Sequence, residues 1–151
     1  CPFMINPYAK DDVEELSSSG RKRVLGAALL VGFVLYSIAL VFATHLPNVN
    51  TIVRIHGFDK VLHCAAYGCQ AALAIGVLCI TGRGSFRNIV ILVGALACFG
   101  GLDEITQPRF GRQAEFLDWV ADCVGIALGV YFGRCFFLFV QALINRKTPT
   151  S

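Results

Sequence analysis

The sequence predicts an all-α fold: a polytopic membrane protein with four transmembrane helices in a compact bundle. Of its 151 residues, 56% are hydrophobic and only 15% are charged, and the mean hydropathy is +0.65. A soluble domain carries about 25% charged residues and 45–50% apolar ones. The apolar excess is concentrated in long segments with short connections, and about 20 apolar residues suffice for a helix to cross a bilayer. These connections leave no room for a soluble domain.

The first two helices correspond to two long runs without lysine, arginine, aspartate or glutamate. They are predicted over residues 23–45 and 59–81, and His63 is the residue that interrupts the apolar character of the second. Each run is long enough to span a bilayer.

The third apolar run, which ends at Leu102, is too short to span unaided. Continuing the helix through Asp103 and Glu104 supplies the missing length. The proline that follows Gln107 then ends it, because the residue before a proline avoids the helical region. The third helix is therefore predicted over residues 87–107.

The fourth helix is predicted over residues 116–144, with Asp118 and Asp122 in its first two turns. Arg134 follows Asp118 by about 24 Å along the axis, at 1.5 Å per residue. It therefore lies near the opposite surface, where a long side chain reaches the interface.

Two polar segments flank this membrane domain of residues 21–145. The N-terminal tail, residues 1–20, is expected to be loose or to form one short surface helix. The C-terminal tail covers residues 146–151.

Lysines and arginines are distributed unevenly between the two sides that the helices define. Eight lie on the side of the termini, and the other side carries four, which are Arg54, Lys60, Arg109 and Arg112. Since positive charge concentrates on the cytoplasmic side, both termini are predicted to be cytoplasmic in a multi-pass protein of the bacterial cytoplasmic membrane. The charges form no continuous basic patch, so no nucleic-acid partner is expected.

The seven cysteines are predicted to act as small apolar residues. Six of them fall within the predicted helices, and the sequence has no C-x-x-C pair. We therefore expect neither disulfides nor a zinc site built from thiolates.

Polar residues recur at helical spacing in the second helix, where Asp59, His63, Tyr67 and Gln70 form one stripe. The stripe begins at the outer end of this helix.

A second stripe runs along the fourth helix, where the carboxylates lie four residues apart. It continues through Gly125, Gly129 and Gly133, and glycines at this spacing allow another helix to approach closely. This face of the fourth helix is therefore expected to pack against protein and not against lipid.

The predicted topology brings these polar residues to one depth near the outer surface. The candidates for a pocket there are Asp59, Lys60, His63, Tyr67, Asp103, Glu104, Gln107, Arg112, Asp118 and Asp122. The alternative is that the charges simply pair and fix helix packing. The acids outnumber the nearby cations, however, and ionisable residues within membrane segments usually mark a functional site.

Two segments, "DKVLHCAAY" and "DEITQPRFGRQAEFLDWVADCVGIALG", resemble the VanZ-like family of small bacterial membrane proteins. Its pattern is Asp-Lys-x-x-His at one helix start, then Asp-Glu-x-x-Gln, an Arg, and an Asp with Asn or Asp four residues later. The resemblance covers residues 55–135. The chain departs from it in the compact "PRFG" stretch and in an acidic residue 122, where many relatives carry an amide.

The resemblance implies a link to glycopeptide resistance, since the family is named after a protein that lowers susceptibility to teicoplanin. The first hypothesis is accordingly an outward-facing pocket that engages a lipid head group, a lipid-linked cell-wall precursor or a glycopeptide. Lys60 and Arg112 would hold phosphate, and the carboxylates would bind amines or sugar hydroxyls.

The alternative is a membrane-embedded enzyme that acts on a lipid-linked envelope substrate, with His63 and the carboxylates as general acid and base. Whether there is turnover stays open. A metal version of the enzyme would use His63 with Asp or Glu ligands. No H-x-x-x-H or H-x-x-E-H spacing occurs, however, so the sequence favours no metal and no other cofactor, and metal binding stays open. A transporter is less favoured, because the four helices show no internal repeat.

Overall fold

A computed structural model of the protein describes residues 8–45, 58–110 and 115–146. These residues form four α-helices and no strand: α1 (Tyr8–Thr44), α2 (Phe58–Ile80), α3 (Phe86–Thr106) and α4 (Phe116–Arg146), with a 3₁₀ turn η2 (Gln107–Phe110) after α3. All four helices are long and apolar enough to cross a membrane. The predicted all-α, four-helix membrane fold is thereby confirmed.

The helix α1 differs from expectation at its start. The segment predicted as a polar tail is helical from Tyr8 onward and continues into the membrane span, which begins at Ser19. Its sequence explains the extension. Residues 8–19 contain alanine, lysine, glutamate and leucine, which favour helix, and no glycine or proline that would interrupt it.

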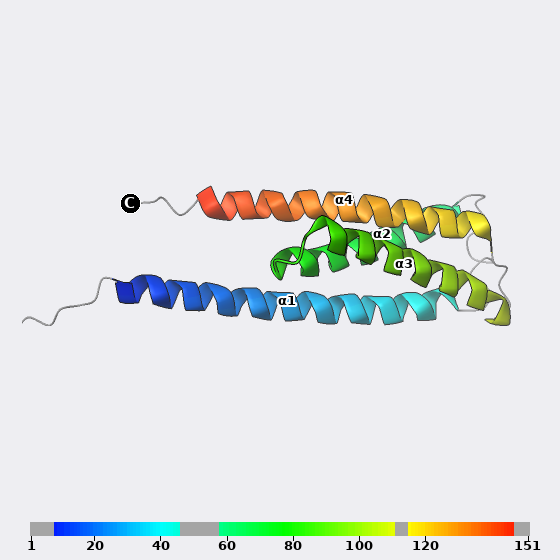
Figure 1. Ribbon diagram of the computed structural model, residues 1–151. Helices are drawn as coiled ribbons and strands as arrows, with labels where there is room; N and C mark the ends of the chain where they lie inside the picture. Colours follow the sequence, from blue (N-terminus) through cyan, green and yellow to red (C-terminus); the bar gives the residue numbers. More distant parts are fainter. Residues whose placement is uncertain (1–7, 46–57, 111–114, 147–151) are drawn as a thin grey trace, which may run out of the picture.

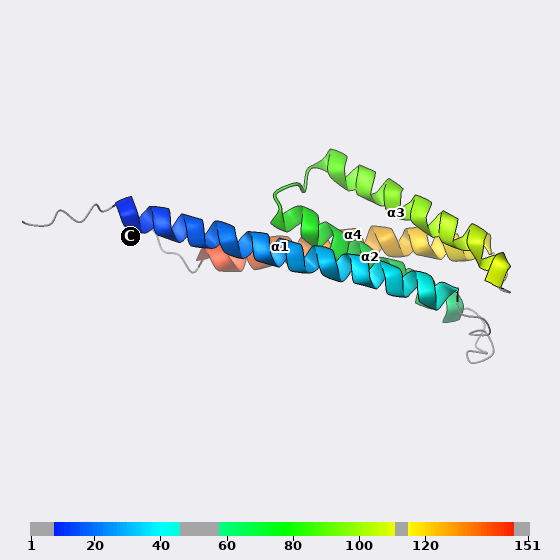
Figure 2. The same ribbon diagram turned by 90° about the horizontal axis from the view of Figure 1, so that it is seen from below.

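The helices alternate in direction, so that α1 and α3 run one way and α2 and α4 the other (Figure 1). The first turn of α1 and the last turn of α4 lie at the same end of the bundle. The opposite end holds Thr44, Phe58, Thr106 and Phe116, and we call it the polar end. Seen from below, α3 diverges from α2 and α4 at its start and approaches them at the polar end (Figure 2).

The closest helix pair is α2 and α4, and the glycine stripe of α4 makes this approach possible. A Cβ atom on Gly125 would collide with the backbone carbonyl of Cys64, and one on Gly129 would collide with that of Gly68. At Gly133 the Cβ would lie 2.6 Å from a side-chain carbon of α2. The stripe therefore packs on α2, as small residues do where membrane helices meet.

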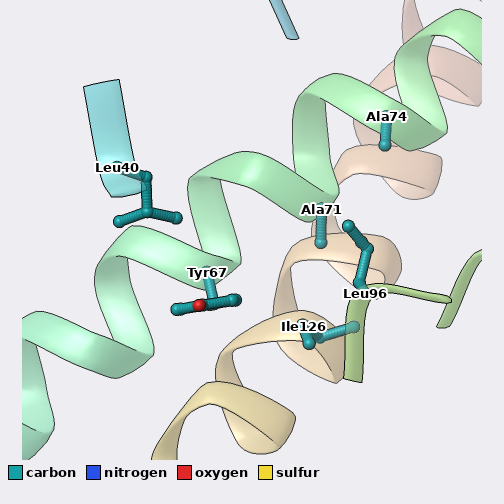
Figure 3. Packing of buried hydrophobic residues seen from close by; sticks show 6 residues of the cluster. All are labelled: Leu40, Tyr67, Ala71, Ala74, Leu96 and Ile126. Atoms are coloured by element: carbon teal, nitrogen blue, oxygen red, sulfur yellow. The ribbon is translucent and has the colours of Figure 1, made fainter. Parts of the chain in front are cut away.

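All four helices contribute to one apolar core, which lies next to the polar end. It consists of Leu40 from α1, Tyr67, Ala71 and Ala74 from α2, Leu96 from α3 and Ile126 from α4 (Figure 3). Side-chain hydrogen bonds also join α1 to α2, because the Tyr36 hydroxyl donates to the Ala66 carbonyl at 3.0 Å.

Large apolar side chains cover the outer faces of the helices. Phe42, Phe86, Ile105 and Phe132 are each more than half exposed. Exposure of this extent suits a hydrocarbon environment, in which backbone polar groups are satisfied within each helix.

Candidate functional site

Most of the buried polar side chains gather at the polar end. They include four carboxylates, Asp103, Glu104, Asp118 and Asp122, which we call the acid cluster, together with Thr44, His63 and Gln107. Burial of charge in this way is costly unless the groups are paired. The partners of each carboxylate therefore define the site.

His63 of α2 lies between two carboxylates from the other helices. Its Nδ1 atom is 2.9 Å from Oδ1 of Asp122 on α4 and 3.9 Å from Oε1 of Glu104 on α3. All three side chains are at least nine-tenths buried. One histidine thus joins α2, α3 and α4 at the polar end.

Glu104 is held by two further donors. The Gln107 Nε2 atom donates to its Oε1 at 3.1 Å, one turn along the chain. The backbone N–H of Glu115 donates to its Oε2 at 3.2 Å. These two bonds fix the orientation of the carboxylate relative to His63.

Asp118 has a lysine as its partner. The Lys60 ammonium donates to Oδ1 of Asp118 at 2.8 Å and to Oε2 of Glu115 at 2.9 Å. The lysine thus contacts two carboxylates, and its role in holding a phosphate stays a prediction.

Asp103 connects the end of α1 to the other helices. The Thr44 hydroxyl donates to its Oδ1 at 2.9 Å, and the Tyr67 hydroxyl donates to its Oδ2 at 3.3 Å. The His45 ring lies 3.5 Å from the same carboxylate and 2.9 Å from the Thr106 hydroxyl. Three helices, α1, α2 and α3, therefore meet at one buried aspartate.

The structure brings nine of the ten predicted pocket residues to the polar end. Asp59 is half-buried, and its carboxylate lies near the His63 ring and the Asp118 carboxylate as part of one group of potential ligands. Arg112 lies outside the described residues. Gln70, which belongs to the predicted stripe, bonds to Ser37 at 2.9 Å and lies away from the acid cluster.

Sequence reasoning missed two residues of the site, Thr44 and Glu115. A threonine at the end of an apolar run carries no periodic signal. Glu115 precedes α4 and gives no helical spacing either, although it lies only three residues before Asp118 in the chain.

Three cavities lie against this site, each between a different pair of helices. One of about 230 Å³ between α1 and α2 is lined by His63 and Asp59, and one of about 340 Å³ between α3 and α4 is lined by Glu104. The largest, about 630 Å³ between α1 and α3, is lined by Asp103 and Arg109. The remaining lining of all three is largely apolar.

The fold and this site define a multi-pass membrane protein with buried ionisable groups at one end of its helices. No family model, no curated protein and no solved structure matches the chain. The VanZ-like resemblance therefore stays a prediction that rests on the motifs alone.

Proposed function

We propose that the protein is a VanZ-like membrane protein that binds the polar head of an amphiphile at the acid cluster. The amphiphile would be a lipid or a lipid-linked cell-envelope precursor. The observation that carries this proposal is the position of the three cavities, each of which joins apolar walls to a buried ionisable residue of the polar end.

The cavity between α1 and α3 supports the proposal best. Its walls include Phe42, Phe99, Leu102 and Phe110, which suit an acyl or prenyl chain. Asp103 and Arg109 line the same cavity, so hydrogen-bond acceptors and a cation lie beside the apolar walls.

These groups suit particular head-group chemistry. The Arg109 guanidinium is suited to a phosphate, which it can contact through two N–H donors. Carboxylates accept hydrogen bonds from amines and sugar hydroxyls. A head group that carries both a phosphate and such donors fits this arrangement.

The charge distribution supports an outward-facing site in the bacterial cytoplasmic membrane. Both ends of the chain's helical core, at Tyr8 and Arg146, lie opposite the polar end (Figure 1). Since the side of the termini carries twice as many lysines and arginines, the polar end faces the exterior. Glycopeptides and cell-wall precursors are accessible from that side.

The test uses three lipids that each carry a photoreactive group in the apolar chain and differ in head group: an aminophospholipid, a phosphatidylglycerol and a polyprenyl-pyrophosphoryl sugar. The full chain in nanodiscs is expected to cross-link preferentially to one head group, within residues 41–45 and 99–110. The preference should be lost in Asp103→Asn and kept in Glu115→Gln, whose parent side chain is about half exposed. Equal labelling by all three lipids, unchanged in Asp103→Asn, would refute the proposal.

An enzyme is the second candidate, and the position of His63 favours it. A buried imidazole between two carboxylates is suited to transferring a proton, with one carboxylate orienting the ring. The discriminating measurement is release of head group from the preferred lipid over time. Stoichiometric binding without release would leave the binding protein as the better account.

A further inference from the structure

Three potential metal ligands converge from three different helices at the polar end. They are one ring nitrogen of His63, one oxygen of Glu104 and one oxygen of Asp122, and these atoms all lie within 4.8 Å of one another. The relative exposures of the three residues are 6%, 5% and 0%. We call this group the His63 triad.

Two buried oxygens at this site have no hydrogen-bond donor among the residues that the structure describes. Oδ2 of Asp122, whose carboxylate supplies one oxygen to the triad, accepts no hydrogen bond from the described part of the chain, although Oδ1 contacts His63. Oε1 of Gln107 is likewise without a donor there, and this side chain contacts Glu104 through its amide nitrogen. A buried acceptor without a partner destabilises the folded protein, and more so when it is charged.

Within the described ranges, the charges around the triad are also unbalanced. Lys60 is committed to Asp118 and Glu115, and a proton on His63 would supply at most one positive charge for the two carboxylates beside it. A divalent cation would neutralise both carboxylates and leave His63 neutral.

We propose that the His63 triad binds a divalent transition metal, with Zn²⁺ as the best fit. Ligand atoms about 2.0–2.1 Å from zinc at a tetrahedral angle lie about 3.3 Å apart. The distances from Nδ1 of His63 to the two carboxylates, 2.9 Å and 3.9 Å, bracket this separation. One nitrogen with two oxygens suits Zn²⁺ better than Mg²⁺ or Ca²⁺, which prefer all-oxygen sites.

A second group of potential ligands, Asp59, His63 and Asp118, shares the histidine. The His63 triad is the better site, because the Asp118 carboxylate already accepts a hydrogen bond from the Lys60 ammonium at 2.8 Å. A metal there would have to displace this cation.

Neighbouring donors would position the ligands of the triad. Gln107 and the backbone N–H of Glu115 both donate to Glu104, and such outer contacts orient carboxylate ligands and strengthen metal binding. Three protein ligands leave one tetrahedral position open, as in zinc sites that bind a further ligand. The cavities lined by His63 and Glu104 lie beside the triad.

The H-x-x-x-H and H-x-x-E-H motifs place two metal ligands on one helix. They therefore do not cover a site whose ligands come from α2, α3 and α4. The inference goes beyond amphiphile binding and does not depend on it. Metal content and lipid cross-linking are separate measurements, so one proposal can fail while the other holds.

The experiment measures metal in the purified full chain after growth with added Zn²⁺ and removal of free ions. We expect about one zinc per chain in the wild type. Asp122→Asn and His63→Gln should retain less than a tenth of it. Asp103→Asn removes a buried carboxylate outside the triad, and it should retain the wild-type amount.

A spectroscopic measurement on the wild type covers the case in which the triad variants do not fold. Co²⁺ bound at the triad should give the intense visible bands of a four- or five-coordinate site, and excess Zn²⁺ should abolish them. The weak spectrum of hexaaqua Co²⁺ together with zinc-free wild-type protein would overturn the proposal. Folded Asp122→Asn and His63→Gln variants with unchanged zinc would overturn it equally.

Discussion

Thr44, at the last residue of α1, donates a hydrogen bond of 2.9 Å to the buried carboxylate of Asp103 on α3. These residues are 59 positions apart in the chain. Because α3 diverges from the other helices at its start, this contact at the polar end is an important link between α1 and α3.

Replacing this threonine with valine should destabilise the protein. Thr44→Val keeps the shape of the side chain but leaves Oδ1 of Asp103 without its hydroxyl donor. The expected cost is about 1–3 kcal/mol of unfolding free energy. Thermal unfolding in detergent measures it. Thr81→Val is the control, because the exposed Thr81 hydroxyl bonds only to carbonyls of its own helix among the described residues. Equal melting temperatures for the two variants would contradict the role of Thr44.

A methyl group on the glycine stripe should separate α2 from α4. Gly129→Ala would bring a Cβ atom into the Gly68 carbonyl, and we expect a loss of at least about 1–3 kcal/mol, as for overpacked cores. Gly129→Leu should lose more. Gly94→Ala on α3 is the matched control, because a Cβ there meets nothing within 4 Å. A Gly129→Ala protein as stable as Gly94→Ala would show that the two helices separate at little cost.

Removing the charge of Glu104 should abolish function without lowering the protein level. In Glu104→Gln the new amide can donate to Gln107, whose own Oε1 has no donor in the described part of the chain and becomes available when its amide flips. The shape of the site is therefore kept. The assay is growth under a glycopeptide, with immunoblots of membrane fractions, and the exposed Glu115→Gln is the control. Full resistance in Glu104→Gln at normal abundance would favour a purely structural role for the acid cluster.

Cysteine labelling in intact cells tests the orientation. In a cysteine-free background, Asn50→Cys and Phe110→Cys should react with a membrane-impermeant reagent. Gly84→Cys, between α2 and α3, should be protected until the cells are lysed. This pattern follows from the excess of lysine and arginine on the side of the termini. The opposite pattern would place the acid cluster at the cytoplasmic surface.

The helices could be predicted from the lengths of the apolar runs, once the third run was continued through Asp103 and Glu104 to reach the length of a span. The depth of Asp103 and Asp122 followed from the same runs, since these residues lie at helix ends. The pairing of Lys60 with Asp118 could not be predicted, because it depends on the rotation of α2 relative to α4. Helical spacing gives that rotation only within one helix, and the partner of a side chain on another helix depends on packing.

The length of α1 relates the site to the thickness of the membrane. From Arg23 to Thr44 this helix rises about 32 Å at 1.5 Å per residue, close to the roughly 30 Å hydrocarbon core of a typical bilayer. Arg23 thus lies at one boundary of the hydrocarbon core, and the hydrogen bond from Thr44 to Asp103 lies at the other. In a thinner bilayer α1 must tilt, and Thr44 would then pull on the end of α3. Hydrophobic mismatch would therefore act directly on the acid cluster, and head-group binding is expected to change with the acyl-chain length of the surrounding lipid.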